Sequence, residues 1–421
     1  MQFGGGGPCG QHGPWVWGAR ICRRRSSTWA TSLLLSLSAI ACGGAGGATA
    51  RGDGGNISTT SGDGPPGAND AGIDGSTCTL PPTDARTPAP MPDNVTFLAN
   101  VTVSTLAGGA TSGTTNGPSG VGLLDNPVSV AIETSGAIAV SDFDNDRLRR
   151  MVAADGTLST LTNQSNFTRP FGLAVVGGVL YAQTDTNPVG QKDASSGTIW
   201  RIDATTGAAT VIGANVGRPR SFAALSDGKL ALADYENQRV RIFDPTSGAV
   251  SDLAGLQGCL GSANGTAGKA RFTEPRGLVV VAGDRIIVAD RTAHILREVS
   301  RAGVVTTFAG DGVAGTIDGP RAGGVRFDQP AALAADAAGD VFVSDFGAHR
   351  IRRIAADGTV TTVAGTGTGG FMDGPGNSAE FYGQEGIAVS PDGATIYIAD
   401  GTLGDEPPGP YHRIRKITIG P

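Results

Sequence analysis

The chain has 421 residues, of which 67 are Gly and 24 are Pro, only 17% are charged, and the formal net charge is -6. This excess of Gly and Pro excludes a helical bundle or a coiled coil, and no long stretch repeats at the helical period of 3.6 residues, which argues against a Rossmann-type enzyme. A mean hydropathy of -0.03 is too apolar for wholesale disorder. The composition therefore predicts a turn-rich, mostly β protein with some flexible sequence attached.

The first part of the chain resembles an export signal. A basic run at residues 20–25 precedes a short apolar stretch at residues 31–41, which suits a signal peptide and is shorter than the roughly 20 residues that cross a bilayer. Ala39-Ile-Ala-Cys42 is similar to a bacterial lipobox. This resemblance implies a signal peptide at 1–41 and a lipid on Cys42. The first fifteen residues add nothing to such a signal and indicate a start site set too far upstream. The alternative is an ordinary secretory signal cut near Ala41.

A flexible tether is expected over residues 42–94, because residues 43–94 contain 12 Gly, 7 Pro and no aromatic residue. Beyond Cys42 the chain has 28 basic and 38 acidic residues, so a basic groove for nucleic acid is not expected. The absence of a CxxC pair excludes a zinc ribbon or a thioredoxin-like site. Cys78 and Cys259 either pair as a disulfide in an oxidising envelope or remain two free thiols.

Residues 95–421 consist of six copies of one unit. Five copies open with a proline, and the sixth opens at Gln384; the prolines are Pro127, Pro170, Pro219, Pro275 and Pro330. An aspartate follows fifteen residues later, or sixteen in the sixth copy, namely Asp142, Asp185, Asp234, Asp290, Asp345 and Asp400. Four short strands per repeat of 43 to 56 residues are typical of a β-propeller blade. We therefore predict an all-β, six-bladed propeller.

The last unit stops after its third strand, at residues 412–417. Residues 101–108 read like the fourth strands of the other units. The N-terminal segment of this domain is therefore expected to complete the last blade and close the ring, which removes an exposed strand edge.

These motifs resemble the repeats of the NHL propeller family. Pro-x-Gly-Leu matches the family's first strand at Pro170 and Pro275 and, less well, at Pro330. Val-Ala-Asp or Val-Ser-Asp, followed by a histidine motif at His294, His349 and His412, matches its second and third strands. The Gly-Asp loops at 315–320 and 370–375 look like those of bacterial NHL proteins and of the teneurin-type propeller. The second unit departs most from the pattern.

The strand directions in a blade place two sets of loops on one face, which is the predicted binding surface. Both sets are long here, at 254–274, 309–329, 364–383, 186–198 and 401–411. The residues directly after the strand starts should ring the channel mouth on that face, namely Val128, Phe171, Arg220, Arg276, Ala331 and Glu385. The two arginines and the glutamate suit an anionic or zwitterionic group; alternatively, they are merely solvated.

The repeated acids and histidines favour structural roles. A catalytic group is needed once, whereas the aspartate recurs in every unit, and a short acid at a strand end can accept backbone N–H groups and fix a turn. The three histidines lie in different blades and would not converge on one metal. We therefore expect the aspartates and histidines to be packing groups.

No catalytic motif is present, because the sequence lacks a Gly-x-Ser-x-Gly elbow, a P-loop and a His-Glu-x-x-His pair. We predict an exported, membrane-tethered, monomeric propeller of the bacterial cell envelope, or a secreted one, that binds a protein, peptide or glycan. The alternative is a metal-dependent hydrolase or lactonase with its site at the channel mouth, where only Glu385 is a suitable ligand. No cofactor is expected, although structural calcium at the Asp-Gly loops stays open.

Overall fold

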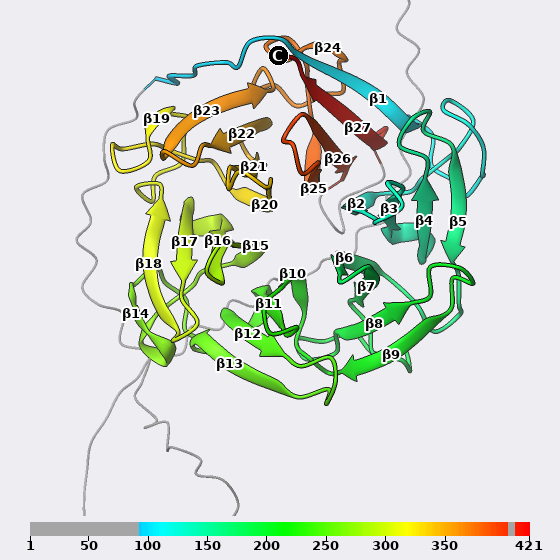
Figure 1. Ribbon diagram of the computed structural model, residues 1–421, viewed down its shortest axis with the longest axis horizontal. Helices are drawn as coiled ribbons and strands as arrows, with labels where there is room; N and C mark the ends of the chain where they lie inside the picture. Colours follow the sequence, from blue (N-terminus) through cyan, green and yellow to red (C-terminus); the bar gives the residue numbers. More distant parts are fainter. Residues whose placement is uncertain (1–91, 403–408) are drawn as a thin grey trace, which may run out of the picture. The chain divides into compact units, whose positions relative to one another are not determined.

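The computed structural model describes residues 92–402 and 409–421, which form a ring of six antiparallel sheets (Figure 1). Helical structure in this part of the chain is limited to single 3-10 turns, η1 (Phe143–Asn145), η2 (Tyr235–Asn237), η3 (Ala267–Lys269) and η4 (Arg291–Ala293). None of its helices is long and apolar enough to span a bilayer. The predicted signal peptide, 1–41, and all but the end of the tether, 42–94, lie outside the described residues.

Each of the first three blades is a four-stranded sheet whose strands follow the chain order from the centre of the ring outward. Blade 1 contains β2 (Pro127–Ile132), β3 (Ile138–Asp142), β4 (Arg147–Met151) and β5 (Leu158–Thr162). Blade 2 contains β6 (Pro170–Val176), β7 (Val179–Thr184), β8 (Thr198–Ile202) and β9 (Ala209–Ala214). Blade 3 contains β10 (Pro219–Ala224), β11 (Leu230–Asp234), β12 (Arg239–Phe243) and β13 (Val250–Gly255).

The next two blades repeat this order, and the last one closes the ring. Blade 4 contains β15 (Pro275–Val281), β16 (Arg285–Asp290), β17 (Ile295–Val299) and β18 (Val304–Ala309). Blade 5 contains β20 (Pro330–Ala335), β21 (Val341–Asp345), β22 (Arg350–Ile354) and β23 (Thr359–Ala364). Blade 6 contains β25 (Gly383–Val389), β26 (Thr395–Gly401), β27 (His412–Ile419) and β1 (Val101–Gly109).

The ring is closed by the strand that was predicted to close it. In Figure 1, β1 (cyan) lies beside β27 (dark red), and the two pair antiparallel with Val103 opposite Ile417. The first strands of neighbouring blades contact one another all the way around, from β2 to β25 and back to β2. The predicted fold class, an all-β six-bladed propeller completed by an N-terminal strand, is confirmed.

The hydrophobic core lies between neighbouring blades. Successive residues of a strand point to opposite faces of the sheet, so one strand supplies two interfaces. In β16, Ile286 belongs to an apolar cluster that includes Ala231 of blade 3, and Ile287 to a cluster that includes Val343 of blade 5. Because both faces are covered, these strands read as short, continuous apolar runs.

Three of the long inter-blade loops add a short strand to the outer edge of the blade that follows. The added strands are β14 (Gly265–Thr266), β19 (Gly319–Pro320) and β24 (Gly374–Pro375), which pair with β18, β23 and β1. This pairing covers backbone groups that an edge strand would expose. Part of each loop that was expected to stand over the binding face therefore lies along the outer edge of a blade.

Candidate functional site

The residues predicted to ring the channel mouth do lie together at the centre of the propeller. In every blade the register between the first two strands shifts at or beside this residue. Such a β-bulge re-aims a side chain away from the regular pleat, here toward the axis. The ring lines a single central cavity of about 160 Å³ and consists of Val128, Phe171, Arg220, Arg276, Ala331 and Glu385.

The side chains that line the mouth are largely buried. Val128 is fully buried, and even Arg220 has an exposed fraction of only 9%. Arg276 of blade 4 donates from Nη2 to Oε1 of Glu385 of blade 6 at 2.6 Å, and the ring residue of the blade between them is the small Ala331. Burial alone would lower the pKa of Arg276, but the charges of Glu385 and Glu274 outweigh it and raise that pKa. The guanidinium therefore stays charged.

Arg220 is clamped between two aromatic rings. Its guanidinium carbon lies 3.9 Å from the ring centroid of Phe171 and 4.8 Å from that of Tyr235, a cation–π arrangement that holds the group flat. Within residues 92–402 and 409–421, Nε of Arg220 and Oε2 of Glu385 are buried without a hydrogen-bond partner, and Nη1 of Arg220 has an ion pair with Asp185 but no hydrogen bond. An unsatisfied buried polar atom costs about 1–3 kcal/mol. An unpartnered Nε recurs at other buried arginines of this domain, whereas Oε2 of Glu385 is the one unpartnered buried carboxylate oxygen among the described residues.

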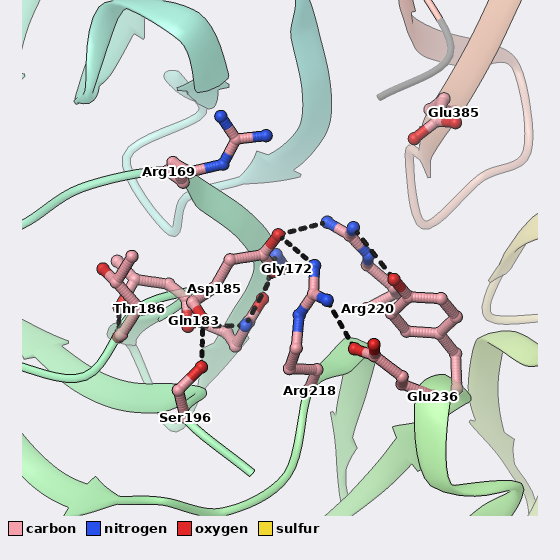
Figure 2. Close-up of polar contacts among 12 residues, drawn as sticks. Arg169, Gly172, Gln183, Asp185, Thr186, Ser196, Arg218, Arg220, Glu236 and Glu385 are labelled. Atoms are coloured by element: carbon pink, nitrogen blue, oxygen red, sulfur yellow. Dashed lines mark hydrogen bonds and ion pairs between the residues drawn. The ribbon is translucent and has the colours of Figure 1, made fainter. Parts of the chain in front are cut away.

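Asp185 holds two arginines at the edge of this mouth (Figure 2). One carboxylate oxygen, Oδ2, lies 2.8 Å from Nη2 of Arg218 and 3.1 Å from Nη1 of Arg220. Arg218 also pairs with Glu236 of η2. Burial opposes ionisation of Asp185, but the charges of Arg220 and Arg218 outweigh it, so its pKa lies below the ordinary value.

This role of Asp185 corrects the expectation that it is one of six equivalent aspartates. In blade 2 the residue opposite the opening proline Pro170 is Thr184, not Asp185. The cause is the turn between β6 and β7, where Gly177 and Gly178 both have positive φ values, 56° and 81°, and form a two-residue hairpin loop. In blades 1, 4 and 5 this loop has three or five residues, and the aspartate itself lies opposite the opening proline. Asp185 therefore lies one residue past the repeated position.

The other five aspartates occupy one register, each opposite the residue that opens its blade. Each accepts hydrogen bonds from backbone N–H groups of the loop that enters the blade; Asp290, for example, accepts from Thr273 and Glu274 at 2.9 and 2.7 Å. This is the turn-fixing geometry expected of a structural acid. Burial raises the pKa to about 6 at two of them and to about 7 at a third, namely Asp142, Asp290 and Asp345.

An arginine accompanies each of these five aspartates, and our sequence reasoning missed it. Four of the arginines are fully buried, and the side chain of Arg241 is 16% exposed. The arginine lies on the third strand, 2.8 to 3.7 Å from its aspartate, and also donates to a carbonyl of the entering loop. The five are Arg149, Arg241, Arg297, Arg352 and Arg415. An arginine seven residues after the aspartate in four units was the available signal. In blade 2, Trp200 takes this position and donates to Thr184 at 2.8 Å.

The three histidines connect neighbouring blades and do not converge. Nδ1 of His294 accepts the backbone N–H of Gln329 at 3.1 Å, and Nδ1 of His412 accepts that of Asn126 at 3.0 Å. His349 stacks on Tyr382 of the next loop. No group of three or more His, Cys, Asp or Glu side chains in the described part of the chain is arranged to hold a metal ion.

Of the cysteines, Cys259 alone belongs to the described residues. Cys259 is disulfide-bonded, so the alternative of a free thiol does not apply to it. Its expected partner, Cys78, and the lipid-acceptor candidate, Cys42, both lie outside the described residues.

Comparisons with known proteins establish the fold and no more. No protein-family model and no curated protein matches the sequence, so the NHL resemblance is not confirmed beyond the six-bladed architecture. A Bacteroides thetaiotaomicron protein of unknown function is similar in structure, with 20% identity, a TM-score of 0.60 and 76% of each chain covered. An auxiliary nutrient binding protein from Bacteroides ovatus has 19% identity and a TM-score of 0.59, covering 76% of this chain and 77% of its own. One from Bacteroides thetaiotaomicron has 18% identity and a TM-score of 0.58, covering 75% and 76%.

Proposed function

We propose that this protein is a binding scaffold that takes an anionic group of a peptide, protein or glycan at its channel mouth. The observation that carries the proposal is Arg220, a buried guanidinium that lines the central cavity and is held between two aromatic rings. Arg276 lines the same cavity. Two preorganised arginines suit a carboxylate or phosphate because the guanidinium fork matches the geometry of these anions.

The size of the cavity supports an end group in preference to a whole small molecule. About 160 Å³ lies well below the ~300–1,000 Å³ of pockets that enclose drug-sized ligands. A larger partner would therefore rest on the loop-rich face and insert only its charged terminus. A peptide chain end or an acidic sugar has this shape.

The structural neighbours support a binding role. Two of them are described as auxiliary nutrient binding proteins, and they share the fold over three quarters of this chain. We also propose that the repeats are of the NHL type and that the protein is exported and anchored in the bacterial cell envelope through a lipid on Cys42. The anchor has a direct test: Cys42→Ser should move the protein from the membrane fraction to the soluble fraction, and continued membrane association would contradict it.

The binding proposal is tested by isothermal titration of the full-length protein with matched charged and neutral probes. Glucuronate is compared with glucose, and triglycine with its C-terminal amide. The acidic member of at least one pair should bind, and Arg220→Gln should weaken that binding by at least tenfold. Arg285→Gln is the matched control, because Arg285 lies in blade 4 and its side chain is 45% exposed. Equal binding of acidic and neutral probes would contradict the proposal.

A further inference from the structure

The contact between Arg276 and Glu385 is unlike the other ion pairs around the axis. The two side chains come from blades 4 and 6 and meet across the mouth, because the ring residue of blade 5 is Ala331. The Glu385 side chain is fully buried, and its Oε1 lies 2.6 Å from Nη2 of Arg276. This is the placement that a bound carboxylate would take against the same arginine.

The pair is also incompletely satisfied. A buried carboxylate needs hydrogen bonds at both oxygens to offset the loss of water, yet Oε2 of Glu385 has no partner among the described residues. Gln384, its neighbour, instead donates to carbonyls of blade 5. The free energy holding Glu385 on Arg276 is therefore smaller than that of a fully hydrogen-bonded pair, and an incoming acid can compete for the arginine.

The second partner of Arg276 differs from Glu385 in position. Glu274 lies 3.3 Å from Nη1 of Arg276 and also pairs with Arg291 at 3.1 Å. It precedes the strand start and does not line the central cavity. Glu274 therefore supplies charge to Arg276 from outside the mouth, whereas Glu385 occupies the mouth itself.

We propose that Glu385 is an internal stand-in for the carboxylate of the ligand: it occupies Arg276 in the free protein and is displaced when a carboxylate-bearing ligand binds. This inference rests on the proposed function and deepens it, because it names the ligand group as a carboxylate and makes the free mouth self-inhibited. The carboxylate comes from a peptide C-terminus or from an acidic sugar, and the shared chemistry is recognition by Arg276.

The test is a gain of affinity on removal of the stand-in. Glu385→Gln keeps the shape and one acceptor oxygen but loses the charge, so the full-length variant should bind triglycine or glucuronate at least tenfold more tightly than the wild type. Binding of triglycine amide and of glucose should not change. A gain for triglycine alone identifies the peptide terminus as the carboxylate source, and a gain for glucuronate alone identifies the acidic sugar.

Glu274→Gln is the comparison variant, because it removes the same charge from a partner of Arg276 that lies outside the mouth. Its gain should be below threefold; gains equal to that of Glu385→Gln would reduce the effect to general electrostatics and overturn the inference. If Glu385→Gln does not fold by thermal unfolding, Glu385→Asp withdraws the carboxylate by one methylene and should give an intermediate gain. If the wild type binds and neither Glu385→Gln nor Glu385→Asp binds more tightly, only this inference is overturned. Absence of binding by the wild type and both variants overturns the proposed function as well.

Discussion

Blade 2 and the other five blades use the same strand order for different purposes. In the five, an aspartate and an arginine tie the inner hairpin to the entering loop, as Asp345 and Arg352 do at 2.8 Å. In blade 2 these positions hold Thr184 and Trp200, and the neighbouring Asp185 reaches Arg218 and Arg220 instead. The comparison teaches that a hairpin loop of two residues, in place of three or five, shifts the register and turns a structural acid into a partner of the arginines at the channel mouth.

The electrostatics of the two arrangements differ in the same way. The repeated aspartates have raised pKa values because burial dominates. This holds even for Asp234, which faces two arginines but at the longer distances of 3.3 and 3.7 Å. Asp185 faces two arginines, and their charges lower its pKa in spite of equal burial. The five-blade arrangement therefore stabilises loops, and the blade 2 arrangement orients cations around the cavity.

The largest expected effect comes from breaking the five-blade arrangement. Arg352→Met removes the cationic partner of two buried acids, Asp345 and Asp318, and a donor to loop carbonyls. The free energy of unfolding should therefore fall by about 3–5 kcal/mol. Urea denaturation measures this loss. Arg285→Met removes a half-exposed partner of Glu298 and should cost less than about 1 kcal/mol; losses of equal size would mean that the buried pair has no special role.

A double substitution can transfer the five-blade arrangement to blade 2. Thr184→Asp and Trp200→Arg should each lower the free energy of unfolding, since each alone introduces an unpaired buried charge. The double variant should lose less free energy of unfolding than the sum of the two single losses. The expected coupling in a double-mutant cycle is about 1–3 kcal/mol. Strict additivity would show that the two positions do not substitute for an aspartate–arginine pair.

The smallest expected effect is a difference between the two arrangements in how the free energy of unfolding depends on pH. An acid whose pKa is raised on folding binds more protons in the folded state, so its contribution to stability falls as pH rises from about 4 toward its folded pKa. For Asp345, with a folded pKa of about 7, the free energy of unfolding should fall between pH 5 and pH 7, and Asp345→Asn should flatten this fall by on the order of 1 kcal/mol.

Asp185→Asn is the control for that titration. Its pKa is lowered on folding, so Asp185 is ionised in both states above pH 5, and its contribution is lost only at more acidic pH. Urea denaturation should therefore show that the free energy of unfolding changes by the same amount between pH 5 and pH 7 in this variant and in the wild type. The assignment of the two kinds of acid would be contradicted if Asp185→Asn reduced the change in the free energy of unfolding between pH 5 and pH 7. It would also be contradicted if Asp345→Asn left that change at its wild-type size.

Most of the fold could be predicted from spacing, and the exception has a physical cause. Residues 101–108 matched the missing fourth strand because strand pattern and turn residues recur in each unit, and the mouth ring followed from the repeated strand starts. Asp185 was misassigned because it shares the fifteen-residue spacing, whereas pairing depends on the length of the loop at Gly177-Gly178. The ion pair between Arg276 and Glu385 joins blades far apart in sequence, and a pattern within one repeat carries no information on it.

The pairing of β1 with β27 also fixes the order in which the ring can be built. Val103 must wait for Ile417, its partner near the other end of the chain, so the mean sequence separation of the contacts in blade 6 is far higher than in any other blade. Such non-local contacts form late in folding. Until β27 has emerged, the molecule carries an open strand edge that can pair with another chain, and the interval before closure is its period of greatest exposure to aggregation.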